Sequence, residues 1–262
     1  MHNVLILNYH SLDVGKTSAE YHVDPVYSVT QQDFEQQMAL IKELKIPVVS
    51  LAEVVAHVKK RQRWHRHVVC ITFDDGFVTD YEVAFPILQK YNFPATFFIT
   101  IQNQTSKVRW AQWKEMVAAG FSLGSHTVSH PFLSLLPEPE MRRELEESKR
   151  IIETETGANV TFLAPPYGRY NRQLIRVAQE CGYEALLTTN VGVNRYNADL
   201  FQLKRWTVRR KTSLKSFRRM ILRNRRELRI KQMRSRSMNL GKKVLGNGFF
   251  EKIRNFILRP KS

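Results

Sequence analysis

The segment VVCITFDDG, residues 68–76, is the clearest indication of the fold. Its first six residues are all apolar or β-branched, which predicts a strand buried on both faces. The run ends on Asp74 and Asp75, and Gly76 permits a sharp exit because glycine adopts backbone conformations closed to other residues. A buried strand that delivers two carboxylates to its end is typical of parallel sheets with a functional site at the carboxyl edge.

Similar apolar runs alternate with helical patterns along most of the chain. Strands are expected at Val4–Asn8, Pro47–Ser50, Val68–Phe73, Ala95–Thr100, Phe121–Gly124, Val160–Ala164 and Ala185–Thr188. Helices are expected at Gln31–Leu44, Leu51–Arg63, Thr79–Tyr91, Ala111–Ala119, Glu138–Thr156 and Asn171–Cys181. This alternation implies parallel strands joined by helical crossovers. We therefore expect an α/β fold, a distorted (β/α) barrel of about seven strands, in preference to an open doubly wound sheet.

Polar groups follow the ends of several expected strands. His10 follows the first strand, Asp74 and Asp75 follow the third, and His126 and His130 follow the fifth. In β/α barrels the carboxyl ends of the strands carry the chemistry. We therefore expect these side chains to lie on one face of the barrel.

One carboxylate with two imidazoles is a common catalytic metal set that leaves a position open for water or substrate. His126 and His130 are four residues apart, so both rings face one side if their segment begins a helical turn. The second carboxylate can act as a base on the bound water. Each motif also has a structural alternative, since Asp-Asp-Gly turns are frequent and paired histidines can be ordinary surface or core residues. Together the motifs indicate a metal-assisted hydrolase.

Three motifs carry a resemblance to a known family. They are T-F-D-D-G at 72–76, H-T-x-x-H at 126–130 and P-Y-G at 166–168, in this order. The chain resembles the NodB-homology polysaccharide deacetylases, a carbohydrate esterase family 4-like group, over residues 1–208. The segment L-I-L-N-Y-H-S at 5–11 is most similar to the branch that deacetylates poly-N-acetylglucosamine.

The resemblance implies a role for each matching residue. Asp74 matches the general base, and His10 matches the proposed general acid. One divalent metal ion is implied, zinc first, with cobalt, nickel or manganese as alternatives. The implied metal ligands are Asp75, His126 and His130, and the implied groove wall is Pro166, Tyr167 and Gly168, with the Tyr167 N–H as oxyanion donor.

Two departures from the family pattern concern the base and the acid. Many members carry an arginine that steadies the base before the x-P-Y triplet, where this chain has Ala164. Many also carry a late Leu-x-His segment, but residues 186–190 read LLTTN. The missing late histidine agrees with His10 as the acid, whereas the missing arginine leaves the partner of Asp74 open.

The expected activity is hydrolysis of N-acetyl groups on an amino-sugar in a polysaccharide, oligosaccharide or lipid-linked glycan, as in exopolysaccharide biosynthesis. A deformylase of a lipid-linked formamido sugar is an alternative, because the same site would serve a formamide. A third hypothesis is a weakly catalytic carbohydrate-binding protein. The intact aspartate and histidine set argues against this last one.

The net charge of +17 is concentrated near the C-terminus. Residues 204–262 hold 21 Lys and Arg against Glu227 and Glu251, a net charge of +19. Residues 1–203 hold 20 basic and 22 acidic groups, a net charge of −2. We expect a deacetylase barrel over residues 1–208 and a basic amphipathic extension over residues 209–262.

Apolar residues recur near helical spacing inside this basic extension, which is typical of a membrane-surface element. Peripheral contact with an anionic membrane through residues 209–262 is expected, and packing of the apolar face on the barrel is the alternative. A nucleic-acid partner is not expected, because the extension lacks a recognisable nucleic-acid motif. The N-terminus lacks a signal-peptide pattern and no apolar run suits a transmembrane helix. We therefore expect a cytoplasmic protein, peripheral at the inner face of the membrane.

Overall fold

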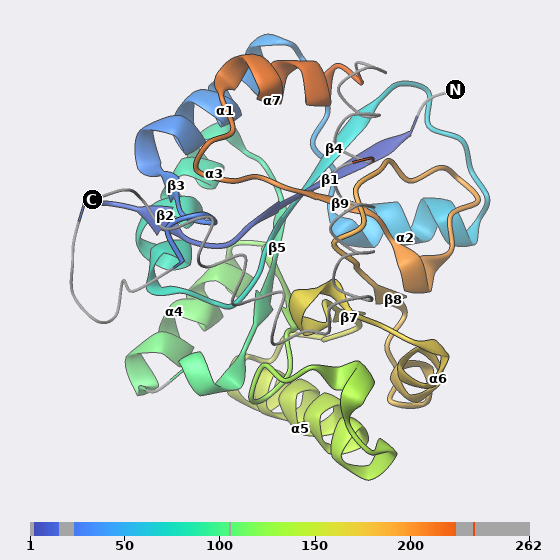
Figure 1. Ribbon diagram of the computed structural model, residues 1–262. Coiled ribbons are helices and arrows are strands. Elements are labelled where there is room, and N and C mark those ends of the chain that lie inside the picture. Colours follow the sequence, from blue (N-terminus) through green and yellow to red (C-terminus); the bar gives the residue numbers. More distant parts are fainter. Residues whose placement is uncertain (1–2, 16–23, 105, 224–232, 234–262) are drawn as a thin grey trace.

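The computed structural model describes residues 3–15, 24–104, 106–223 and 233 (Figure 1). Its centre is a seven-stranded parallel sheet in the order β8-β7-β6-β5-β4-β1-β9. The strands are β1 (Val4–Tyr9), β4 (Val68–Phe73), β5 (Ala95–Ile99), β6 (Ser122–Ser125), β7 (Phe162–Leu163), β8 (Ala185–Leu186) and β9 (Arg205–Thr207). Every residue of β1, β4 and β5 is buried, as continuous apolar runs predict.

The sheet curls into a distorted β/α barrel, which confirms the expected fold class. The last strand, β9, returns to pair with β1 in parallel register, Ile6 facing Arg205. Beyond the two edge strands, a single parallel bridge joins Leu187 to Leu203. A separate two-stranded pair, β2 (Leu12–Asp13) with β3 (Val29–Thr30), lies outside this sheet.

Helices surround the sheet, and capping residues mark where several of them begin or end. They are α1 (Gln31–Glu43), α2 (Leu51–Lys59), α3 (Phe85–Tyr91), α4 (Lys107–Ala118), α5 (Glu138–Thr156), α6 (Arg172–Glu180) and α7 (Leu214–Ile221). Before α2, Ser50 and Glu53 form a reciprocal capping box that satisfies otherwise unpaired N–H groups. After α5, Gly157 adopts the left-handed conformation with φ 73°.

The predicted helix at Thr79–Tyr91 is divided in two. A π-helical turn spans Asp80–Ala84 and α3 follows it from Phe85. Pro86 lies at the start of α3 and has no N–H to donate to the preceding turn. The wider turn is one way in which a helix accommodates a missing bond in its ladder.

Other predictions differ from the structure in extent. The strand at Val68–Phe73 and the helix at Glu138–Thr156 are confirmed residue for residue. The strand predicted at Pro47–Ser50 was wrong in extent, since only Val48 makes a bridge, to Val69. The strands β2, β3 and β9 were not predicted, because two or three residues carry too little periodicity to be recognised.

The described part of the basic extension includes a helix, α7, that packs against the hydrophobic core. Helix α7 lies beside α1, and its residues Phe217, Met220 and Ile221 are buried (Figure 1). The Phe217 ring lies 5.8 Å from the ring of Trp206 on β9. Most of the extension, residues 224–232 and 234–262, lies outside the described residues. Within the described chain, no helix has the length and apolar character needed to cross a bilayer.

Phe217→Ala should destabilise the barrel by about 3–5 kcal/mol, because it removes a fully buried aromatic ring. Lys215→Ala, on the exposed side of the same helix, should change stability by less than about 0.5 kcal/mol. Urea unfolding followed by circular dichroism measures both. Equal unfolding midpoints for the two variants would show that α7 contributes nothing to the core.

Candidate functional site

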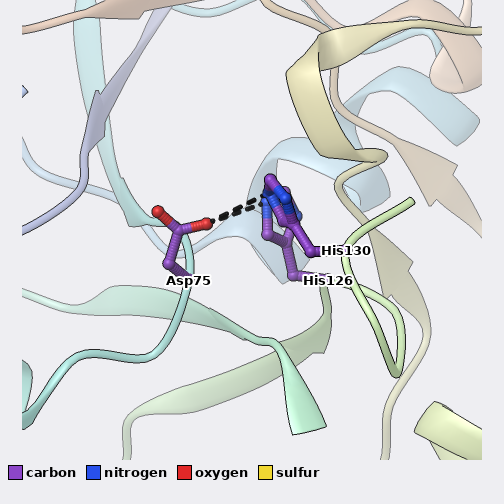
Figure 2. A group of neighbouring side chains, drawn as sticks. All are labelled: Asp75, His126 and His130. Carbon is purple, nitrogen blue, oxygen red and sulfur yellow. Dashed lines mark ion pairs between the residues drawn. The ribbon is translucent and has the colours of Figure 1, made fainter. Parts of the chain in front are cut away.

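Three side chains converge at the carboxyl edge of the sheet (Figure 2). Asp75 follows β4, and His126 and His130 follow β6. The Asp75 Oδ1 atom lies 3.2 Å from His126 Nε2 and 3.4 Å from His130 Nε2. One ligand atom from each of these three side chains lies within 4.8 Å of the other two. Within the described residues, they are the set of carboxylate, imidazole or thiol groups close enough together to hold a metal ion.

The backbone of this group is held in an uncommon conformation. Asp75, Thr127 and His130 have φ values of 79°, 73° and 58°, in the left-handed region that non-glycine residues rarely adopt. The expectation of a helical turn at 126–130 was therefore wrong, because a left-handed residue interrupts a helix. The two imidazoles face Asp75 through a bent loop instead. Such strain is typical of functional sites whose surroundings fix the conformation.

Helix α5 fixes the loop that carries His130. The Glu144 carboxylate accepts hydrogen bonds from the N–H groups of Val128 and Ser129, at 2.8 and 3.0 Å, and from the Ser129 hydroxyl at 2.6 Å. The His130 N–H donates to the Thr127 hydroxyl at 3.0 Å. Glu144 was not predicted from the sequence, because its helical position alone does not indicate which loop it meets.

A backbone carbonyl orients the His126 ring. Nδ1 of His126 lies 2.5 Å from the carbonyl oxygen of Ala164, just after β7. A proton on Nδ1 leaves the Nε2 lone pair facing Asp75, and metal-ligating histidines are usually fixed in this way. Ala164, where many family members have arginine, therefore contributes its main chain to the site.

The chemistry of the donor set fits a divalent metal ion. One carboxylate and two imidazoles, with an edge partly open to solvent at His130, match catalytic zinc sites that retain a free coordination position. The same nitrogen and oxygen donors also accept cobalt, nickel or manganese. The three residues predicted as ligands are thus brought together.

The partner of Asp74 is Arg205, the first residue of β9. Two parallel hydrogen bonds join them, Nη1 to Oδ1 at 2.7 Å and Nη2 to Oδ2 at 2.8 Å. Asn8 of β1 lies between them, donating to Asp74 at 3.0 Å and accepting from Arg205 at 3.1 Å. The Arg205 Nε also donates to the Thr188 carbonyl at 3.1 Å. Both charged side chains are buried.

This pair sets the charge state of Asp74. Burial has the largest influence on the Asp74 carboxyl and raises its pKa. The charge of Arg205, its hydrogen bonds and the nearby His126 outweigh burial, so the net pKa is lowered. Arg205 was counted only among the basic residues near the C-terminus, since nothing in the sequence relates it to a carboxylate 131 positions earlier.

His10 lies close enough for its charge to interact with those of Asp75, Asp74 and His126. Its ring stands 4.9 Å from the ring of Tyr27, just before β3. Burial is the largest influence on His10 and lowers its pKa, against the opposing effect of the two carboxylates. His10 thus lies at the carboxyl edge of β1, within electrostatic range of the candidate metal centre.

The segment Pro166–Gly168 forms a wall next to His130. Tyr167, with φ 62° and 42 % of its side chain exposed, has its ring 4.9 Å from the ring of His130. Phe132 stacks on Tyr167 at 4.2 Å between ring centroids. A Cβ atom on Gly168 would lie 2.2 Å from the Thr189 hydroxyl oxygen, so only glycine fits there.

Removing one member of the Asp74–Arg205 pair should destabilise the protein. Asp74→Asn or Arg205→Met leaves a buried charge without its partner, and each should lower the free energy of unfolding by about 3–5 kcal/mol. The double variant should recover part of that loss, because no unpaired charge remains. Urea unfolding of the four proteins measures the coupling. Strictly additive losses would show that the two side chains do not interact.

Comparison with known proteins relates the chain to polysaccharide deacetylases. Residues 61–186 match the family model described as polysaccharide deacetylase. The chain is 28 % identical over 202 residues to YxkH of Bacillus subtilis, covering 76 % of this chain and 69 % of that protein. It is 27 % identical over 198 residues to the poly-beta-1,6-N-acetyl-D-glucosamine N-deacetylase of Staphylococcus epidermidis, covering 68 % of this chain and 67 % of that enzyme.

Among solved structures, the deacetylase PplD of Streptococcus pyogenes, in complex with acetate, superimposes with a TM-score of 0.72. The two chains are 28 % identical, and the match covers 80 % of this chain and 94 % of PplD. The similarity thus extends well beyond the segment matched by the family model.

Proposed function

We propose that the chain, whose residues 61–186 match the polysaccharide deacetylase family, is a metal-dependent hydrolase of N-acetyl groups. Its substrate would be an amino-sugar in a polysaccharide, an oligosaccharide or a lipid-linked glycan. The observation that carries the proposal is the convergence of Asp75, His126 and His130 beside the buried Asp74–Arg205 pair. The name of the S. epidermidis relative, an N-deacetylase of poly-N-acetylglucosamine, supports the substrate class.

We assign the metal to Asp75, His126 and His130. A divalent ion at such a site polarises the acetyl carbonyl and lowers the pKa of water toward neutrality. The chain contributes the geometry: Ala164 fixes the His126 ring, and Glu144 fixes the loop of His130. The donor atoms are therefore held in place before any ligand arrives.

Asp74 is the proposed general base. Arg205 and Asn8 bind its carboxylate in a buried position and keep it ionised, so that it can accept a proton from the attacking water. Because Arg205 engages both carboxylate oxygens, it also fixes the plane of the group. Arg205 thus acts as a positioning residue, from another strand than the family arginine that Ala164 replaces.

His10 is the proposed general acid. Deacetylation releases a sugar amine, which needs a proton as the carbon–nitrogen bond breaks, and the His10 imidazolium would supply it. The N–H of Tyr167, in the wall beside His130, is the proposed donor to the tetrahedral oxyanion. Preorganised donors of this kind contribute a few kcal/mol to transition-state stabilisation.

His126→Ala should abolish metal retention and activity, because it removes one of three ligands. Metal content after gel filtration, measured by inductively coupled plasma mass spectrometry, tests this. His65→Ala is the matched control, since His65 is exposed on the loop before β4. A His126→Ala protein that keeps one metal ion per chain would contradict the ligand assignment.

The reaction is tested by mass spectrometry of N-acetylated and N-formylated saccharides incubated with the metal-loaded protein. Wild type should release acetate, whereas Asp74→Asn and His10→Ala should retain metal and lose about 10²–10⁴-fold in rate. Formate release in preference to acetate would favour the deformylase alternative. Saccharide binding without either product would favour a weakly catalytic binding protein. Wild-type turnover by His10→Ala at every pH would assign the acid to another residue.

We also propose a location for the enzyme. Residues 204–262, with a net charge of +19, would attract it to the anionic cytoplasmic face of the membrane as a peripheral protein. Apolar residues at helical spacing within the extension, such as Phe249, Phe250 and Ile253, suit a lipid surface better than a nucleic acid.

A further inference from the structure

Cations gather at the end of the barrel opposite the candidate active site. Lys42 lies in the last turn of α1, and Lys45 lies two residues after that helix ends. Arg66 lies two residues before β4. All three are exposed and line one open cleft of about 330 Å³, together with Tyr91 and Asn92. Among the described residues, no carboxylate forms an ion pair with any of them. Their charge is therefore not neutralised by the described part of the chain.

Helix α7 extends this cationic region. Its Arg218 lies 4.0 Å from Glu43, the neighbour of Lys42 in sequence. At the end of α7, the buried Arg223 donates to the Val68 carbonyl and to the Asn3 side chain, at the amino ends of β4 and β1. We call Lys42, Lys45, Arg66 and Arg218 the basic face. It therefore lies at the amino ends of the strands, where the described chain reaches residue 223.

An apolar side chain accompanies the basic face. Leu222, just after α7, is 50 % exposed and precedes Arg223, which contacts the amino ends of β1 and β4. The sequence that continues from this point, residues 224–262, holds 12 Lys and Arg against Glu227 and Glu251, a net charge of +10. An exposed leucine among cations is typical of elements that lie in the headgroup region of a bilayer.

We propose that the basic face docks on an anionic phospholipid bilayer, with the catalytic edge of the barrel turned away from it. The occupant follows from the combination of groups: cations attract phosphate-bearing headgroups, and the exposed Leu222 enters the acyl boundary. A nucleic acid would use the cations and leave Leu222 in water. The docking does not depend on the proposed reaction, whereas its consequence for the substrate rests on the proposed function.

This orientation has a consequence for the substrate. Strands β1 and β4 have six residues each, so the two ends of the barrel stand about 20 Å apart. A docked protein therefore holds Asp75 and His130 at least that far from the lipid surface. A sugar joined directly to a lipid headgroup does not reach the site, whereas a glycan several units long does. The docked state selects extended glycans over the first sugar of a lipid-linked precursor.

The first test is vesicle binding by the full-length protein. Vesicles of phosphatidylcholine with phosphatidylglycerol should bind wild type, and pure phosphatidylcholine vesicles should not. The triple variant Lys42→Gln, Lys45→Gln, Arg66→Gln should lose about 10²-fold in affinity, the effect of three cations near an anionic leaflet. The matched control is Lys114→Gln, Arg143→Gln, Arg150→Gln, which removes the same charge from exposed positions on α4 and α5.

The control triple should keep near wild-type binding, and urea unfolding checks that both triples are folded. Equal loss in the two triples would show that only total charge matters, and wild-type binding by the first triple would show that the face is not used. Either result overturns the proposal.

The second test measures orientation. In a Cys181→Ser background, where Cys70 remains buried, a polarity-sensitive fluorophore is attached at Leu222→Cys or at Leu135→Cys. Leu135 is 66 % exposed on the segment that follows His130, at the catalytic edge. Anionic vesicles should blue-shift the label at position 222 and leave the label at 135 unchanged. A response at 135 alone, equal responses, or binding to single-stranded RNA with an unresponsive label at 222 would overturn the proposed orientation.

Discussion

The buried ion pair between Asp74 and Arg205 fixes the candidate base in the sheet. It joins β4 to β9 across β1, and Asn8 of β1 binds both partners. The first and last strands of the sheet in sequence are therefore fixed at the position where the candidate base must sit. Neither charge can be buried alone without a penalty of several kcal/mol. The pairing with Arg205 that avoids this penalty also orients the Asp74 carboxylate.

The candidate metal ligands are held by a different means. Asp75 and His130 adopt left-handed backbone conformations, each of which costs of order 1–3 kcal/mol for a non-glycine residue. That cost is offset by hydrogen bonds from outside the loops: Glu144 on α5 accepts from the backbone before His130, and the Asn103 side chain donates to the Asp75 carbonyl. A rigid scaffold therefore supports loops that would not adopt these shapes alone. The donor atoms face one another because hydrogen bonds from α5 and from the residue after β7 hold the histidines in place.

The sequence predicts the positions of the long buried strands well, because continuous apolar runs such as Val68–Phe73 have few other interpretations. It also predicts the site residues that follow strand ends, since parallel strands bring their carboxyl ends to one edge. It does not predict Arg205 or Glu144, whose partners are distant in sequence and depend on packing. Nor does it predict the bent loop at His126, because a four-residue spacing fits both a helical turn and a left-handed bend.

Helix α7 shows why charge alone is a poor guide to where a domain ends. Its helical period places apolar and charged side chains on opposite faces of one eight-residue helix. Phe217 and Met220 are buried in the core, while Arg218 and Arg219 are exposed. The basic composition that sets residues 209–262 apart in the sequence therefore begins inside the barrel. Because α7 reaches the amino ends of β1 and β4, its cations lie opposite the catalytic groups. A surface at that end can meet a partner without covering Asp75, His126 and His130, so docking and turnover need not compete.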